Sequence, residues 1–209
     1  MMYAGQFSPV ERLLQNAIDT GATPGVALLV EKNGELVYQK ALGDAQVYPE
    51  PRPLGFNDLF DLASLTKVVA TTTAIMQLAR DQQLDVHESV QRYLPEFPHP
   101  QIRLWHLLTH SAGLPAWLPL YESVQAEADR QNVAFIGRTA VQRLALEQIY
   151  HAPLSCAPGQ ESTYSDLGFI VLGHLIETLT QTALDVYCAA NIFRPLNMAD
   201  TFFQPIGQP

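Results

Sequence analysis

The segment Ser64-Leu65-Thr66-Lys67 is the stretch from which the fold and chemistry of this chain are best predicted. Residues three apart are neighbours on an α-helix, so Ser64 and Lys67 are expected side by side. A serine hydroxyl is a weak nucleophile, and a nearby lysine amine is one recognised way to activate it. The pair alone is also compatible with a capping serine followed by a surface lysine, so its meaning depends on its surroundings.

Ser64 lies at the predicted start of a helix whose apolar pattern runs from Leu65 to Leu78. Unpaired N–H groups and the positive dipole end of a helix favour an alkoxide and, later, an oxyanion. The helix is apolar on much of its surface, which predicts a central position. Lys67 lies among apolar residues, where desolvation would lower its pKa and make it a plausible base.

Composition indicates a globular chain and argues against several functions. Of the 209 residues 47% are hydrophobic, which is enough for one domain, or one and a half, with a real core. The net charge of −9, with scattered Arg and Lys, argues against nucleic-acid binding. Cys156 and Cys188 form no disulfide framework and are expected to be free thiols.

The N-terminal segment predicts the location of the protein. Residues 1–9 lack a basic region followed by an apolar run, so no signal peptide is expected, and no apolar stretch is long enough for a membrane span. We therefore expect a cytoplasmic protein. The alternative is an exported protein whose signal has been removed.

The N-terminal quarter predicts a helix and a hairpin, and the remainder is mainly helical. A helix is predicted over 8–20, and Asn33-Gly34 is a strong turn signal between strands 26–30 and 36–43. Residues 44–58 are expected to form a loop. Further helices are predicted near 88–93, 103–109, 120–130, 139–149, 167–179 and 183–193, with a short piece of strand at 201–203.

This inventory leaves the sheet incomplete. A two-stranded hairpin is marginal in water, and its open edges invite pairing. Either another chain completes the sheet, or the sequence stops before its partner strands.

Two further segments suit a catalytic site around Ser64. Tyr164 comes just before an apolar helix; beside a lysine it can shuttle protons, and Asp166 can hold the lysine amine. His106 and His110 have the spacing of a metal pair, but Leu107 stands where the usual Glu would be. A buried structural role is therefore expected for the two histidines, and no metal site.

The stretches 60–67, 106–115 and 164–169 together resemble the serine β-lactamase-related superfamily, which includes class C β-lactamases, penicillin-binding proteins, esterases and D-aminopeptidases. The resemblance implies an α+β, β-lactamase/transpeptidase-like fold: an antiparallel sheet with flanking helices plus a mainly helical part. The chain would be one incomplete domain, with 1–58 in the α/β part and 59–209 in the helical part.

The resemblance also implies roles for individual residues. Ser64 would be the acylated nucleophile, Lys67 its activating partner and Tyr164 the general acid/base. Asp166 stands where many members have Asn; its charge would favour protonated Lys67 and shift the base role toward Tyr164. Asp166 and Leu65 are expected to support the site or bind substrate. Neither a metal nor an organic cofactor is implied.

The chain departs from the family more strongly in a second respect: no late Lys-Thr-Gly or His-x-Gly motif is found in the sequence. The chain would be, in order of preference, a fragment, one half completed by a second chain, or a short and weakly active relative.

The predicted function is a serine hydrolase acting on a small ester or amide. Alternatives are a penicillin-binding-protein-type peptidase, a D-aminopeptidase, a true β-lactamase, or a non-catalytic binding module.

Overall fold

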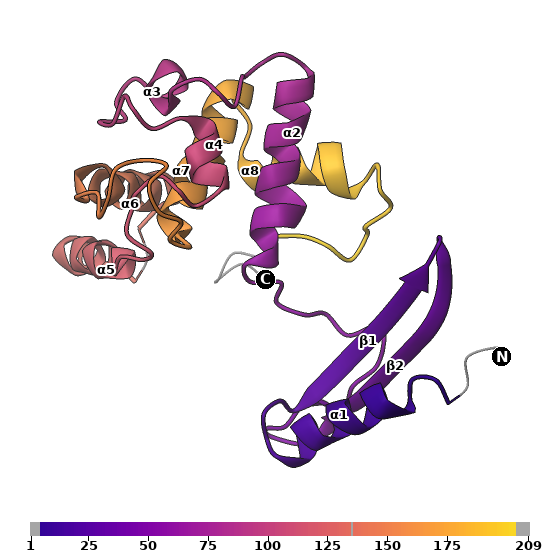
Figure 1. Cartoon of the computed structure of the whole chain (residues 1–209). Helices are drawn as coiled ribbons and strands as arrows, with labels where there is room; N and C mark the ends of the chain where they lie inside the picture. The colour runs from indigo at the N-terminus through magenta and orange to yellow at the C-terminus, as the bar shows by residue number, and fades with distance from the viewer. Residues whose placement is uncertain (1–4, 135, 204–209) are drawn as a thin grey trace. The chain divides into compact units, whose positions relative to one another are not determined.

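A computed structural model describes residues 5–134 and 136–203, and the chain divides into two compact units, Met1–Asp61 and Leu62–Pro209 (Figure 1). The first unit holds one helix and a three-stranded sheet, and the second is helical. The predicted α+β composition is therefore confirmed. Residues 1–4 of the segment expected to lack a signal peptide, and residues 204–209 at the end of the sequence, lie outside the described residues.

The first unit is built on the predicted helix and hairpin. Helix α1 (Ser8–Asp19) carries a proline in its first turn, where the missing N–H is no loss. Strands β1 (Gly25–Lys32) and β2 (Glu35–Gln46) pair antiparallel. Asn33 and Gly34 between them have φ values of 55° and 82°, the two positive angles that a tight hairpin turn needs. Both predictions are confirmed.

A third strand lies where a loop was predicted. Strand β3 (Arg52–Pro53) pairs antiparallel with the end of β2, with Asp44 opposite Pro53 and Gln46 opposite Arg52. It forms because β2 continues past Gly43 and offers its backbone to the returning chain. Proline is tolerated there because β3 lies at a sheet edge. Conversely, the described residues 201–203 form no strand, contrary to expectation.

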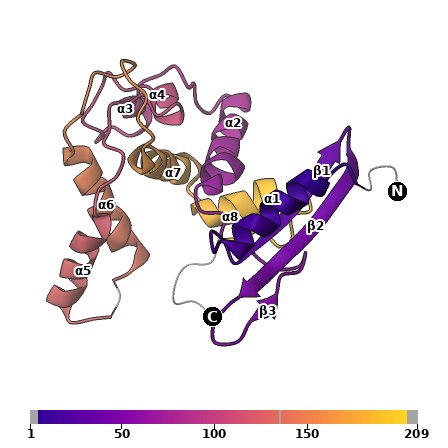
Figure 2. The same ribbon diagram turned by 60° about the horizontal axis from the view of Figure 1, so that its bottom comes forward.

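None of the described residues 5–61 is fully buried. Helix α1 lies against β2 (Figure 2). The Phe7 ring stacks on that of Tyr38, with ring centroids 4.2 Å apart. The Tyr38 hydroxyl donates a hydrogen bond to Glu11 on the same helix. On β1, by contrast, Leu29 is 62% exposed. Over these described residues, the first unit is thus a sheet with a helix beside it and without a closed core.

The second unit is a set of packed helices at the predicted positions. After η1 (Lys67–Thr72), a π-helix, and α2 (Thr73–Arg80), the elements are α3 (Val90–Tyr93), α4 (Leu104–Leu108), α5 (Leu120–Gln131), α6 (Arg138–His151), α7 (Asp166–Thr180), α8 (Leu184–Cys188) and a second π-helix, η2 (Ala189–Phe193).

Helix α7 organises the core of this unit. It contacts η1, α2, α3, α4, α6 and α8, and its residues Leu167, Leu172, Leu175 and Ile176 are fully buried. A helix that is apolar nearly all round belongs in a core. Among the described residues no single helix is long and apolar enough to cross a membrane; only α7 with Leu184–Phe193, bent by 75°, meets that test as a pair.

The helix after Ser64 is central only in part. Ala74, Ile75 and Leu78 are buried, whereas Leu65, Val68 and Met76 are more than half exposed. Where an α-helix was predicted, Lys67–Thr72 form a π-helix, and the hydroxyl of Thr73, the first residue of α2, donates to the carbonyl of Val68 at 2.9 Å. Single π-turns inside helices are frequent at functional sites.

Candidate active site

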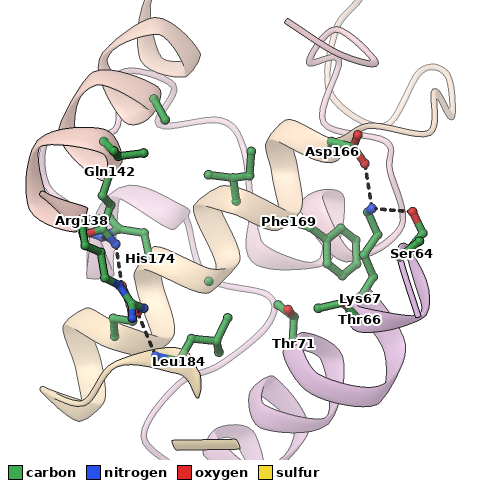
Figure 3. Close-up of a pocket in the computed structure, with 16 residues that line it drawn as sticks. Ser64, Thr66, Lys67, Thr71, Arg138, Gln142, Asp166, Phe169, His174 and Leu184 are labelled. Atoms are coloured by element: carbon green, nitrogen blue, oxygen red, sulfur yellow. Dashed lines mark hydrogen bonds and ion pairs between the residues drawn. The ribbon is translucent and has the colours of Figure 1, made fainter. Parts of the chain in front are cut away.

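Ser64, Lys67 and Asp166 form a hydrogen-bonded row at the N-terminal ends of η1 and α7 (Figure 3). The Lys67 ammonium donates to Ser64 Oγ at 3.1 Å and to Asp166 Oδ1 at 2.7 Å. Ala63 before the serine has φ of 43°, a left-handed conformation that costs a non-glycine residue energy. The predicted adjacency of Ser64 and Lys67 is confirmed.

Tyr164 completes the row from the loop before α7. Its side chain is 55% exposed, and its ring centroid lies 5.0 Å from Lys67 Nζ. Hydrogen bonds with Ser64 and Lys67, together with the positive charge of Lys67, lower the pKa of Tyr164 below its ordinary value. A phenol with a lowered pKa and a hydrogen bond to the serine can take up and return a proton.

Lys67 is held in its charged form. Burial lowers its pKa, but the hydrogen bonds and charges of Asp166 and Tyr164 outweigh burial, so the pKa of Lys67 is raised. The expectation that desolvation would make Lys67 a neutral base is therefore wrong. The physical reason is the direct ion pair with Asp166, which supports the alternative expectation that Asp166 favours protonated Lys67.

Tyr164 and Asp166 are positioned by backbone hydrogen bonds between two loops, one around residues 109–119 and the other around residues 152–165. Gly159 N–H donates to the carbonyl of Ser111, and Thr163 N–H donates to that of His110, at 2.7 and 2.9 Å. Asp166 N–H donates to the carbonyl of Ala116 at 3.0 Å. The segment predicted to be structural, residues 106–115, therefore fixes the loop that carries the tyrosine.

Gly113 allows the two loops to approach each other. Its φ is 79°, and a Cβ added there would overlap the carbonyl oxygen of Cys156, which explains the glycine. Ser155 N–H donates to the carbonyl of Gly113 at 2.8 Å at the same crossing. The loops meet backbone to backbone, so a side chain here would separate them.

His106 and His110 have separate roles within these loops. His106 is buried and its Nδ1 accepts the N–H of Arg103, which caps α4. His110 Nδ1 accepts the N–H of Ser165, and its ring lies 4.4 Å from the Tyr164 ring, centroid to centroid. Burial and the charge of Lys67 lower the pKa of His110. In the described part of the chain no cluster of three metal-ligating side chains was found.

A cavity of about 680 Å³ extends from Ser64 along α7 to α6. Its far end is formed by Arg138, Gln142, His174 and Glu177, residues that no sequence motif singled out. They lie far from Ser64 along the chain, and only the packing of α6 against α7 brings them to one cavity. Among the described residues that line the cavity Leu65 does not appear, and its expected supporting role stays a prediction.

Comparisons with known proteins agree with this architecture. A curated protein of Salmonella agona (strain SL483), named "Putative D-alanyl-D-alanine carboxypeptidase", is 33% identical over 208 residues, which cover 92% of this chain and 46% of that protein. The structure titled "EstCE1, a hydrolase with promiscuous acyltransferase activity" is similar at 26% identity with a TM-score of 0.73, over 90% of this chain and 50% of that one.

A penicillin-binding protein from Bacillus halodurans shares the fold at 24% identity, with a TM-score of 0.72 over 94% of this chain and 59% of that one. The chain thus spans about half the length of the curated relatives it matches. The predicted β-lactamase/transpeptidase fold is confirmed. The family model described as "Beta-lactamase" matches residues 10–207, nearly the whole chain, and this chain therefore belongs to the Beta-lactamase family.

Proposed function

We propose that this protein is a serine hydrolase that cleaves a small ester or amide through an acyl-enzyme on Ser64. The observation that supports it best is the bridging position of Lys67, which hydrogen-bonds Ser64 and Asp166 while Tyr164 hydrogen-bonds both Ser64 and Lys67. A nucleophile within reach of a proton acceptor, oriented by a third group, is the usual signature of covalent catalysis.

Acylation follows from the charges of the site. Ser64 Oγ attacks the carbonyl carbon, and its proton passes to Tyr164, whose lowered pKa favours the phenolate. Protonated Lys67 stabilises the negative charge on Ser64 and Tyr164 as it develops. The bond from carbonyl carbon to the leaving oxygen or nitrogen then breaks, and Tyr164 returns the proton to the leaving group. Deacylation repeats the sequence with water as nucleophile.

Asp166 determines which of Lys67 and Tyr164 accepts the proton of Ser64. Its carboxylate lies 2.7 Å from Lys67 Nζ; the Lys67 side chain is 14% exposed and the Asp166 side chain 46% exposed, so the lysine is the shielded partner of this ion pair. With Lys67 held positive, Tyr164 is the group left to accept the proton. The proposed base is therefore Tyr164, and Lys67 acts as an electrostatic partner.

A chromogenic ester tests the proposal. Wild-type protein should release a burst of product and form a covalent adduct on Ser64 that mass spectrometry detects. Ser64→Ala should abolish both. Tyr164→Phe should lower kcat/KM by about 10²–10⁴-fold, the usual contribution of general acid–base catalysis. Absence of a burst and of an adduct would contradict the proposal and favour a non-catalytic binding module.

Tyr121→Phe is the matched control for Tyr164→Phe. Tyr121 is likewise exposed, at 64%, but it belongs to α5 and its ring lies 6.5 Å from that of Trp117, centroid to centroid, outside the hydrogen-bonded row. Its variant should keep wild-type kcat/KM. An equal loss in both variants would show that the effect comes from general surface disturbance.

The second candidate is a D,D-carboxypeptidase. The name of the Salmonella agona relative favours it. Labelling of Ser64 by a fluorescent penicillin distinguishes the two candidates: strong labelling would favour the peptidase, and ester turnover without labelling would favour the esterase.

A further inference from the structure

The cavity beside Ser64 continues as an apolar groove between α6 and α7 (Figure 3). Its middle section is lined by side chains without charge: Phe169, Ile170 and Gly173 on α7, Val141 and Ala145 on α6, and Leu184 of α8. From Asp166 to Gly173 the helix rises about 10 Å. A substrate group must therefore be several atoms longer than acetyl to reach this section.

The polar groups at the far end of the groove are paired with one another. Arg138 forms ion pairs with Glu177 and Asp185 at 2.6 and 3.1 Å, and Gln142 donates to Glu177 at 2.5 Å. Burial lowers the pKa of His174, which favours the neutral ring. With two carboxylates against one guanidinium, this end offers no excess positive charge to an anionic substrate. The charge balance at this end and the apolar residues of the middle section together favour an uncharged substrate group.

Gly173 keeps the middle of the groove open. A glycine inside a helix is disfavoured relative to alanine, so its presence needs a reason. A Cβ added to Gly173 would meet only the Leu184 side chain, at an ordinary contact distance of 3.5 Å. Helix packing thus tolerates a side chain at this position, whereas the groove would be narrowed by one.

The position of Tyr164 indicates which half of the substrate would use the groove. Tyr164, the proposed proton donor to the leaving group, does not line the cavity among the described residues, whereas Ser64 and Lys67 do. The leaving group therefore lies on the tyrosine side. Resting on the proposed function, we propose that the groove between α6 and α7 is an acyl subsite that binds an extended, uncharged aliphatic acyl chain of an ester held at Ser64.

A series of p-nitrophenyl esters from acetate to octanoate tests this subsite. In the wild-type protein kcat/KM should rise with chain length, by up to about fourfold per buried methylene. Gly173→Val and Ala145→Leu should each lower the octanoate-to-acetate ratio of kcat/KM by about tenfold or more. The two substitutions narrow the groove from opposite walls. If one variant misfolds, as detected by circular dichroism, the ratio measured for the other variant still tests the subsite.

Ala140→Leu is the matched control, since Ala140 lies on α6 but does not line the groove in the described part of the chain. It should leave the octanoate-to-acetate ratio at the wild-type value. A wild-type preference for acetate, or an unchanged ratio in both groove variants, would overturn the subsite while leaving the hydrolase proposal intact.

Binding without turnover separates the two proposals. In Ser64→Ala protein, hexanamide should bind more tightly than acetamide in a chemical-shift titration, and Gly173→Val should abolish the difference. If no ester is cleaved but this difference is present, the hydrolase proposal fails and the groove remains as a binding site for aliphatic chains. If hexanamide binds no more tightly than acetamide, the subsite is refuted, whether or not the wild-type protein cleaves esters.

Discussion

The two compact units of this chain differ most in what they bury. The second unit has a continuous apolar core around α7, with Leu172, Leu175 and Ile176 fully buried. The first unit has no fully buried residue among its described positions 5–61. The proposed catalytic row and both loops that support it belong to the second unit, so the better-packed unit carries the site.

This difference teaches how the sheet of such a fold depends on its surroundings. A sheet contributes stability when its faces and edges are covered, and here β1 lies at the edge of a three-stranded sheet. The chain spans about half the length of the curated relatives it matches. That another chain or a further segment adds strands to this sheet stays a prediction. Helices pair their backbone N–H and C=O groups internally, so the second unit depends less on hydrogen bonds to other segments or chains.

The largest expected contrast concerns a leucine in each unit. Leu172→Ala removes a fully buried side chain from α7 and should lower the free energy of unfolding by about 2–5 kcal/mol. Leu29→Ala on β1 removes a side chain that is 62% exposed and should change it by less than about 0.5 kcal/mol. Urea denaturation of both variants measures the contrast. Equal losses would show that the first unit buries Leu29 against something else.

Two glycines with positive φ allow the cost of backbone strain to be measured apart from the cost of steric overlap with a neighbour. Gly113→Ala should cost about 2–4 kcal/mol, because the new Cβ adds overlap with Cys156 to the left-handed strain. Gly21→Ala in the first unit has the same sign of φ, at 74°, but meets nothing within 4 Å. It should cost only about 1–2 kcal/mol. Thermal unfolding tests this, and a Gly113 variant no worse than the Gly21 variant would contradict the close loop crossing.

The pH dependence of activity sharpens the electrostatic account of the second unit. Asp166 raises the pKa of Lys67 and, through its charge, that of Tyr164. Asp166→Asn should therefore lower both pKa values and move the pH profile of kcat/KM toward acid. The rate at the new optimum should stay within about tenfold, since asparagine can still accept a hydrogen bond from Lys67.

Asp81→Asn is the control, because it breaks an exposed ion pair with Arg80 away from the site and should leave the profile unchanged. A profile that does not move in Asp166→Asn, or moves toward alkaline pH, would contradict the role given to Asp166.

The smallest expected effect lies in the first unit. Partial burial, the hydrogen bond with Glu11 and the charge of that carboxylate raise the pKa of Tyr38 to about 12. Between pH 10 and 12 the unfolded chain therefore loses this phenolic proton first, and the first unit loses stability as the pH rises. Glu11→Gln should bring the phenol titration, followed by ultraviolet absorbance, back toward 10. Glu31→Gln should not, and an unchanged titration in Glu11→Gln would refute the hydrogen bond between Tyr38 and Glu11.

The sequence determined most of the elements because their signals are local. Asn33-Gly34 specifies its hairpin turn through two positive φ values, and the apolar run after Asp166 specifies a buried helix. The sequence missed β3 because a two-residue strand follows from pairing with β2 and has no pattern of its own. It also predicted a regular α-helix after Ser64, since residue propensities do not distinguish an α-turn from a π-turn.

For the candidate site, the sequence by itself determined the family and the spacing of Ser64 and Lys67, because three residues along a helix are always neighbours. For the protonation of Lys67 the sequence offered two opposing expectations, desolvation and the charge of Asp166. The tertiary structure decided between them, because it places Asp166, 99 residues away, 2.7 Å from Lys67 Nζ. It alone assembled the groove, because Gly173 and Ala145 line the same cavity as Ser64 only when α6 packs against α7. Charge balance and cavity shape are properties of distances between elements, and a sequence records only their order.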